Sequence, residues 1–511
     1  MSGMASGIPI LTLLTVLPVV GAVVALLAGK HARGVAMITA LASMAVALLV
    51  WSHLPANGSM GLAEVHQWVP SLGIEYHLGV DGLGALMLVL SGIVTLMSID
   101  AAHRVHRQPG LYFALVLLLE ACLFGAFTAL NFFHWFLFWE LSLIPAFFLI
   151  KLWGGAKRGP AATQFFVYTM AGSVGLLLAF LALFLATKSM DFTHLSLLAS
   201  TGELDQAVAS QFHQGPVMMW LAVGVLAGFA VKVPLMPFHT WLPAAYAEAP
   251  SPVTMMLTGT MSKMGVYGLL RIALPIFGHQ IAQIRTPLLV LAVATVVMGA
   301  WAAAAQKDLK RVFAYSSVNH LGYCQLAIFA LAIPATSAAM QASQAAALNG
   351  VILQMFNHGI TAAALFWFVA MIQERTGGHR GIDDFGGLRK PAPVFAGLMG
   401  FALFSSLGLP GLNGFVGEFL IFRGVFPLAW VAATVSILGL LVTAAVILTV
   451  IQKVFTGPVP ERLATFPDMH HGERLAMAPV IALMLLIGLV PQLIVDSVNP
   501  TVVNLLAHWR F

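Results

Sequence analysis

Two lysines lie inside long apolar stretches of this 511-residue chain, where a charged side chain is costly. One apolar segment, residues 216–236, carries Lys232, and the next, residues 252–274, carries Lys263. Three acids, Glu120, Glu140 and Glu418, are embedded in apolar sequence in the same way. Ionisable groups at this depth are expected to pair with one another or to carry protons. These residue types therefore predict a proton path through an apolar chain.

The chemistry expected of these groups differs from one to the next. Lys263 has no acid in its own segment. Because burial disfavours its charged form, this lysine can release a proton. The alternatives are a static ion pair or a lysine whose side chain reaches the membrane surface. Glu140 and Lys232 would stabilise each other's charges when close, although a purely structural salt bridge is also open. Glu418 follows a glycine-rich break, which favours a proton carrier over a neutral carboxyl in a helix contact.

Three histidines add candidate relays. His320 and His358 lie within apolar segments, and His239 lies in the proline-rich loop after Lys232. An intramembrane histidine can also simply hydrogen-bond a neighbouring helix, and His239 is as well explained by bracing its loop. Glu120 either tunes the acid at position 140 or packs as a neutral side chain.

Composition places the whole chain in a membrane. It is 60% hydrophobic and 8% charged, and its mean hydropathy is +0.93, so residues 1–511 are expected to form a single membrane domain. The two cysteines, Cys122 and Cys324, are far apart and form no metal-cluster or haem motif, and a phosphate-binding loop is missing. No metal or cofactor is expected in this chain, and its net charge of +5 requires no nucleic acid.

Apolar segments long enough to cross a membrane predict an all-α polytopic protein with about fourteen transmembrane helices. The 24 lysines and arginines concentrate in alternate loops, which orients both termini away from the cytoplasm. Lys232 and Lys263 are then the only bases left inside the membrane.

Two of the predicted spans, helices 7 and 12, are interrupted. Residues 232–252 contain five prolines, and residues 408–418 contain Gly408, Pro410 and three further glycines. Non-helical backbone in a membrane needs protein or a hydrated cavity around it, and paired breaks are typical of inverted repeats. We therefore predict two inverted five-helix repeats, spans 4–8 (residues 111–274) and spans 9–13 (residues 286–452).

Several sequence motifs together resemble the antiporter-like proton-channel subunits of respiratory NADH:quinone oxidoreductase, or complex I. The motifs lie between about residue 80 and about residue 430: FWELSLIP (138–145), KVPLMPFHTWLP (232–243), EAP (248–250), SKMGVYGLLR (262–271), KDLKRVFAYSSVNHLG (307–322), FNHGITAAALF (356–366) and GLPGLNGFVGEF (408–419). The acid at position 418 is similar to the subunit M branch, also called subunit 4, whereas the L and N branches and the antiporter subunits typically carry lysine.

The resemblance implies proton translocation driven by quinone reduction in neighbouring subunits. NADH, FMN, iron–sulphur clusters and quinone would be held by partners, and L-like and N-like subunits would be neighbours in a bacterial inner membrane. Glu140 and Lys232 would form a coupled ion pair, Lys263 the central relay and Glu418 the exit-side carrier. His320 and His358 match relay positions between Lys263 and Glu418.

One departure and two alternatives remain. The family commonly reads LPDAHTEAP where this chain has LPAAYAEAP, so Ala244 and Tyr246 replace an acid and a histidine on which a proton entry role would rest. The first alternative is a subunit of a multisubunit cation/proton antiporter without redox coupling. The second is a membrane subunit of a related hydrogenase in which proton transfer is vestigial.

Overall fold

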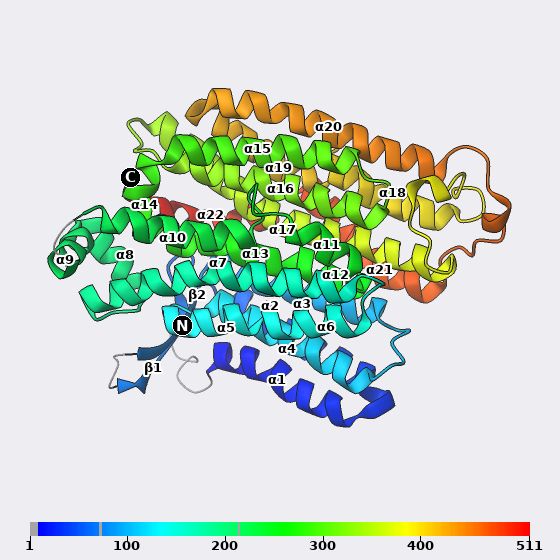
Figure 1. The fold of residues 1–511 in the computed structure, drawn as a ribbon, viewed down its shortest axis with the longest axis horizontal. Helices are drawn as coiled ribbons and strands as arrows, with labels where there is room; N and C mark the ends of the chain where they lie inside the picture. The colour runs from blue at the N-terminus through cyan, green and yellow to red at the C-terminus, as the bar shows by residue number, and fades with distance from the viewer. Residues whose placement is uncertain (1–8, 71–73, 213–214) are drawn as a thin grey trace.

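Long apolar helices make up most of the chain, and they lie side by side in an elongated bundle (Figure 1). The computed structural model describes residues 9–70, 74–212 and 215–511. In this part of the chain ten helical segments are long and apolar enough to cross a membrane. They are α1 (Ile10–Leu27), a short turn with α2 (Gly29–Ser52), α3 (Gly82–Ala101), α4 (Pro109–Thr128), α5 with α6 (Phe132–Leu141 and Leu143–Trp153), α7 (Arg158–Thr187), α15 (Arg285–Ala304), α17 (Ala338–Arg375), α20 (Trp430–Phe455) and α21 (His471–Leu489). The chain is a multi-pass membrane protein.

Four other predicted spans are helical but do not meet the same test of length and apolarity. They are α10 (Val217–Lys232), the helix over residues 251–273, α16 (Leu309–Leu331), and the pair α18 (Pro393–Leu407) and α19 (Asn413–Leu428). These are the segments that carry Lys232, Lys263, His320 and Glu418. Breaks shorten three of them and polar residues reduce the hydropathy of α16, so the count of about fourteen stays a prediction.

Both predicted breaks are confirmed. The helix α10 ends at Lys232, and α11 (Trp241–Glu248) begins after an irregular loop, because closely spaced prolines cannot all be accommodated in one helix. The second break separates α18 from α19, where Gly408 (φ +82°) and Gly411 (φ +94°) adopt left-handed backbone that other residues rarely adopt. The division into two repeats stays a prediction.

The helix after the first break is itself irregular. It consists of α12 (Ser251–Met256), a π-helical segment (Leu257–Met261), α13 (Ser262–Gly268) and a second π-helical segment (Leu269–Ala273). The wider turns of a π-helix are uncommon and occur often at functional sites. Lys263 therefore lies on a short α-helical stretch between two widened ones.

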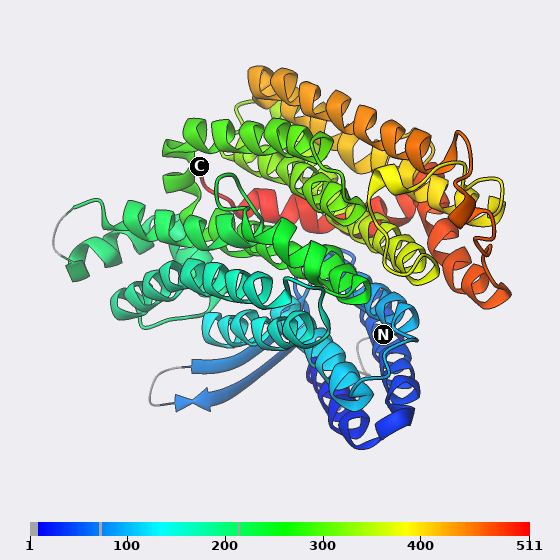
Figure 2. The ribbon, with the colours of Figure 1, turned by 45° about the vertical axis from the view of Figure 1, so that its right-hand side comes forward.

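A β-hairpin was missed by the all-α prediction. β1 (Gly61–Val69) pairs antiparallel with β2 (Ile74–Val80), and Figure 2 shows both strands extending along one end of the bundle. Alternating apolar and polar residues in β2 gave a strand signal that the hydropathy count passed over. The remaining helices are α8 (Phe192–Thr201), α9 (Glu203–Phe212), α14 (Leu274–Gln283) and α22 (Gln492–His508), with short turns at Gly29–His31, Ile382–Asp384 and Glu461–Leu463.

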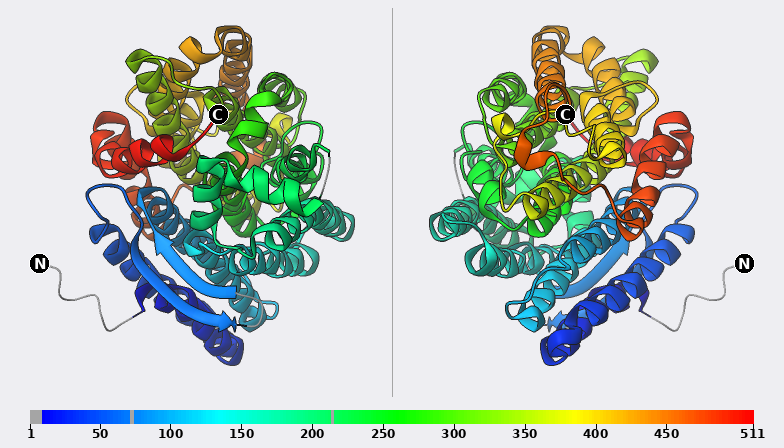
Figure 3. Two further views of the ribbon diagram at one scale, coloured as in Figure 1. Left: turned by 90° about the vertical axis from the view of Figure 1, so that its left-hand side faces the viewer. Right: turned by 90° about the vertical axis from the view of Figure 1, so that its right-hand side faces the viewer.

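The helix α17 forms the centre of the molecule. Its most apolar window is 94% buried, whereas several other long helices are mostly exposed to the surroundings of the bundle. It packs against α16, α18, α19 and α3, and the end-on views show helices around the centre of the bundle (Figure 3). Polar residues in the middle of α17, such as Gln354, Asn357 and His358, are consequently buried among other helices.

Candidate functional site

Lys263 is fully buried and its amine is directed at two polar partners. Its Nζ atom donates to the backbone carbonyl of Thr258 and lies 2.7 Å from Nδ1 of His358 on α17. Thr258 belongs to the first π-helical segment, whose altered hydrogen-bond register makes a carbonyl available to the amine. As the sequence indicates, Lys263 has no acid in its own segment. Its side-chain partner is a histidine, His358.

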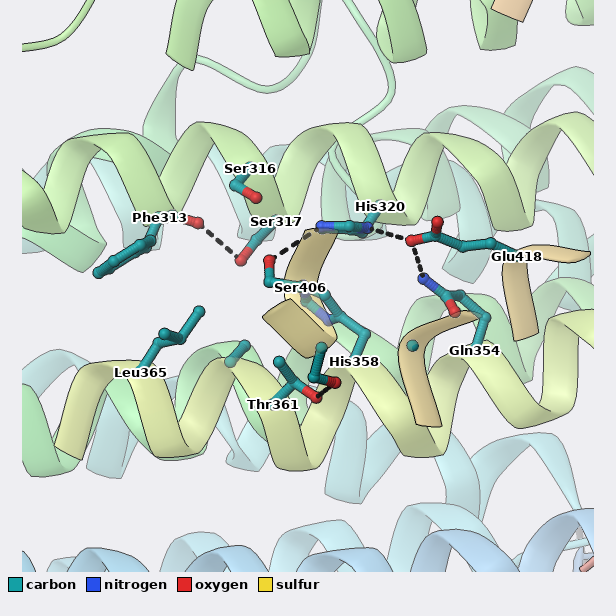
Figure 4. A pocket seen from close by; sticks show the side chains of 13 residues that line it. Phe313, Ser316, Ser317, His320, Gln354, His358, Thr361, Leu365, Ser406 and Glu418 are labelled. Carbon is teal, nitrogen blue, oxygen red and sulfur yellow. Dashed lines mark hydrogen bonds and ion pairs between the residues drawn. The ribbon is translucent and has the colours of Figure 1, made fainter. Parts of the chain in front are cut away.

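A second histidine continues from the first. The rings of His358 and His320 lie 5.3 Å apart between centroids, and Nδ1 of His320 is 3.1 Å from Oε1 of Glu418. Four side chains from four segments, the helix over residues 251–273, α17, α16 and α19, therefore lie in a series from Lys263 to Glu418, in which the two histidine rings face each other and share no hydrogen bond. Figure 4 shows the second half of this series, with His320 between His358 and Glu418.

A small cavity, lined by both polar and apolar side chains, adjoins this series. Its volume is about 20 Å³, which is room for about one water molecule. The walls include His320, His358 and Glu418, and several hydroxyl groups surround them, from Ser316, Ser317, Thr361, Ser405 and Ser406 (Figure 4). Water and hydroxyls can pass protons between groups that do not touch directly, so the cavity extends the reach of both histidines.

The break between α18 and α19 is fixed by side-chain amides. Asn413, the first residue of α19, accepts a hydrogen bond from Asn357 on its carbonyl (2.7 Å) and one from Ser405 on its side-chain oxygen (2.5 Å). Its own amide reaches the carbonyl of Asn357 at 3.3 Å. Gln354, one turn earlier on α17, lies 3.5 Å from Glu418. These contacts position the carboxylate beside α17.

The predicted ion pair between Glu140 and Lys232 is not formed in this structure. Both residues are described, and no nitrogen–oxygen contact within 4.0 Å joins them. The buried Nζ of Lys232 lies instead 4.6 Å from the ring centre of Trp139 and has no hydrogen-bond partner. Glu140, the residue after Trp139, is half-buried.

His239 and Glu120 lie apart from the series. The ring of His239 approaches Tyr315 on α16, at 6.2 Å between centroids, and its Nδ1 has no hydrogen-bond partner. Glu120 is fully buried in α4, and neither of its carboxyl oxygens has a hydrogen-bond partner. No described contact brings either residue to Lys263, and their roles stay predictions.

Lys232 and Lys263 are not the only buried bases in the described part of the chain. Arg271 and Lys310 are also buried, although the loop count placed both in surface loops. Arg271 lies 2.6 Å from Asp81, and Lys310 donates to the backbone carbonyl of Ala249. Hydropathy alone puts the ends of a segment at the surface, but neighbouring elements cover these ends.

The loop that departs from the family pattern is closely packed. Tyr246 on α11 is buried and donates a hydrogen bond of 3.0 Å from its hydroxyl to the carbonyl of Leu257, the first residue of the π-helical segment before Lys263. The tyrosine therefore connects the second half of the broken helix to the helix of Lys263, and it was not assigned this contact from sequence.

The chain is similar to known proteins over nearly its whole length. The family described as "NADH:quinone oxidoreductase/Mrp antiporter, TM" matches residues 129–447. The chain is 34% identical over 98% of its length to NADH-quinone oxidoreductase subunit M of Rhodobacter capsulatus, of which the match covers 97%. It is 32% identical over 98% of its length to subunit M of Rickettsia typhi, of which the match covers 99%.

Solved structures show the same fold. A chain of respiratory complex I from Thermus thermophilus with bound NADH matches 98% of this chain and 100% of its own length, at 27% identity and a TM-score of 0.85. A chain of the Mrp complex from Dietzia matches 97% of this chain and 97% of its own length, at 22% identity and a TM-score of 0.80, and shows a common fold only. From the family match and the full-length relatives, the chain belongs to the NADH:quinone oxidoreductase/Mrp antiporter transmembrane family.

Proposed function

We propose that the chain is the subunit M-like, proton-translocating membrane subunit of an NADH:quinone oxidoreductase. Its full-length relatives bear the name NADH-quinone oxidoreductase subunit M, and the chain has the buried polar series that proton transfer requires. The free energy to drive each proton against the membrane potential, about 2.3 kcal/mol per 100 mV, would come from quinone reduction in partner subunits.

One observation carries this proposal. Lys263, His358, His320 and Glu418 are contributed by separate segments, yet they lie next to one another in a buried series with a water-sized cavity beside it. Burying four ionisable side chains is costly, and a helix contact would need only one or two of them. In our proposal Lys263 is the central relay, the two histidines pass the proton on, and Glu418 is the carrier at the far end.

Glu140 and Lys232 have a regulatory place in this scheme. Because Lys232 is without a hydrogen-bond partner, a small movement that brings Glu140 closer would stabilise its charge. The change in charge would act on Lys263 through space, since Lys232 lies next to Val233, which contacts the helix of Lys263. Glu120 is assigned a role in tuning Glu140, and His239 is assigned a role as a candidate relay.

The chain would lie in the cytoplasmic (inner) membrane of a bacterium with both termini on the non-cytoplasmic side, between L-like and N-like subunits. NADH, FMN, iron–sulphur clusters and quinone would be bound by other subunits. An antiporter subunit is the second candidate because the Mrp fold is shared, but Glu418 stands where such subunits typically carry lysine.

The decisive variant is Lys263→Ala. In membranes that contain the assembled complex, we expect proton pumping to be lost and coupled NADH oxidation to fall, while NADH oxidation by an artificial acceptor upstream of quinone is retained. Lys453→Ala is the matched control, because Lys453 is half-exposed and pairs with Asp383 at the surface. Unchanged pumping in an assembled Lys263→Ala complex would contradict the proposal.

A further inference from the structure

A buried ion pair lies at one end of the helix that carries Lys263. Nη2 of Arg271 is 2.6 Å from Oδ2 of Asp81, and the two side chains are 6% and 3% exposed. Asp81 also caps the first turn of α3, where its other carboxyl oxygen accepts a hydrogen bond of 3.0 Å from the backbone of Gly84. Two opposite charges are thus held together away from the surface, with the aspartate anchored to a helix.

The pair forms part of the wall of a large cavity. Its volume is about 570 Å³, enough for many water molecules. Exposed residues of α8, Thr193 and His194, also line it, so the cavity opens at the surface. Its other polar walls are Ser196, Ser200, Thr501, Asn504 and His508. In Figure 1 this is the end of the bundle that holds α8, α22 and the C-terminus, which the lysine and arginine distribution assigns to the non-cytoplasmic side.

A line of side chains connects the pair to Lys263. Lys263, Tyr267 and Arg271 are spaced four residues apart, so they follow one another along one face of the helix. The guanidinium of Arg271 lies 5.5 Å from the ring centre of Tyr267, and the tyrosine hydroxyl donates to the carbonyl of Phe127 at 3.0 Å. Tyr267 and the ion pair therefore stand between the cavity and Lys263.

The present arrangement is closed. The amine of Lys263 is directed at Thr258 and His358, away from Tyr267 and the cavity. The pair is held through one nitrogen of Arg271, and Nε of the same guanidinium is buried without a hydrogen-bond partner. Such an unsatisfied donor is costly, and a single-point contact is weaker than a two-point one. Arg271 would gain partners by turning toward water in the cavity.

We propose that the Asp81–Arg271 pair is a gate between the outer cavity and Lys263, an inference that rests on the proposed function. With the pair closed, water is kept from Tyr267 and the face beyond it. With the pair open, Arg271 faces the cavity, Asp81 stays on its helix cap, and water reaches Lys263. In this open state the ammonium of Lys263 gives its proton to a water molecule instead of to His358 and becomes a neutral amine, while Arg271 stays protonated throughout. In the closed state the amine faces His358, and the proton passes only along the series to Glu418.

The experiment measures the passive proton permeability of the purified whole complex in vesicles, without NADH and under an imposed pH gradient. Asp81→Asn keeps a good helix cap and removes the charge that holds Arg271. Arg271→Lys keeps the charge and shortens the reach. We expect both to raise the permeability roughly tenfold or more, since a gate that loses its closing contact spends more time open, and to lower the number of protons pumped per NADH.

Controls separate a gate from general damage. Glu473→Gln removes a partner of another ion pair, 2.6 Å to Arg375, which lies outside this cavity, and is expected to leave permeability unchanged. The double variant Asp81→Asn with Lys263→Ala should lose the leak, because the gate leads only to Lys263. A leak that persists in the double variant would overturn the gate. So would gate variants that both keep the wild-type permeability and the wild-type number of protons pumped per NADH in each assembled complex. Lys263→Ala alone tests the proposed function independently.

Discussion

The amine of Lys263 lies 2.7 Å from Nδ1 of His358, a residue 95 positions later in the chain. The contact joins the helix over residues 251–273 to α17, the central helix of the molecule. A proton can cross it without an intervening water. It also shows that His358, and not His320, is the histidine next to Lys263. The sequence around each residue does not reveal this order.

Replacement of His358 by leucine should therefore interrupt the series next to Lys263. Leucine preserves the volume but has no nitrogen, so proton transfer would lose a positioned group, which typically contributes on the order of a hundredfold in rate. Dye measurements of proton pumping in membranes check this, with the amount of assembled complex as the reference. Pumping at the wild-type level would show that His358 only packs there.

Glu418 should need its charge more than its length. Glu418→Gln loses the acid that contacts His320 at 3.1 Å, whereas Glu418→Asp retains a carboxylate that water in the adjoining cavity can connect. We expect the glutamine variant to pump several times less than the aspartate variant, a difference of about 1 kcal/mol in barrier. Equal pumping by both would favour a packing role for this carboxyl.

Glu140 and Lys232 should be coupled although they do not touch. The single variants Glu140→Gln and Lys232→Met and the double variant form a cycle that measures their interaction. If the lysine responds to the acid through space, the loss of pumping in the double variant will be smaller than the combined losses of the single ones. Additive losses would mean that the two residues act independently, and Trp139→Leu would then test whether the aromatic face alone holds the lysine.

The break before α19 should tolerate no side chain at Gly414. A Cβ atom there would lie 2.0 Å from the carbonyl oxygen of Ser405, so the two halves must move apart. We expect Gly414→Ala to destabilise the fold by roughly 1–3 kcal/mol or more, as overpacking does, and to lower the yield of complex. Gly397→Ala on α18 is the control, because a Cβ there meets no heavy atom of the chain within 4 Å.

The hairpin should be attached to α8 in a pH-dependent way. Burial would raise the pKa of Asp191, but hydrogen bonds from His77, Thr193 and the backbone of His194 outweigh it and hold that pKa below its usual value. A carboxyl with a lowered pKa stabilises the fold fully above the ordinary aspartate pKa of about 3.9, and this stabilisation is lost as the pH falls through the lowered value.

Hydrogen exchange of the β2 backbone measures this attachment. Wild-type protection should persist to a pH below about 4, whereas Asp191→Asn should be less protected at neutral pH because its contact of 2.5 Å to His77 loses the charge. Protection that is the same in both proteins at every pH would show that the contact does not hold the hairpin.

Much of the fold could be predicted from sequence because a bilayer imposes strong constraints on it. The apolar segments, the two breaks and the residues worth attention were evident from hydropathy and from prolines and glycines, since these act locally along the chain. The hairpin was passed over, and Arg271 and Lys310 were placed at the surface, because segment ends are covered by elements that are distant in sequence.

By itself the sequence determined which groups are ionisable and that they lie within apolar segments, because the hydrophobic effect and the cost of burying charge depend on residue type. Only the tertiary structure decided which of them meet. Lys263 contacts His358, Glu418 contacts His320, and Arg271 contacts Asp81, a residue 190 positions earlier, whereas Glu140 and Lys232 remain apart. These distances depend on how helices pack around α17 and on π-helical turns that shift side chains by a fraction of a turn.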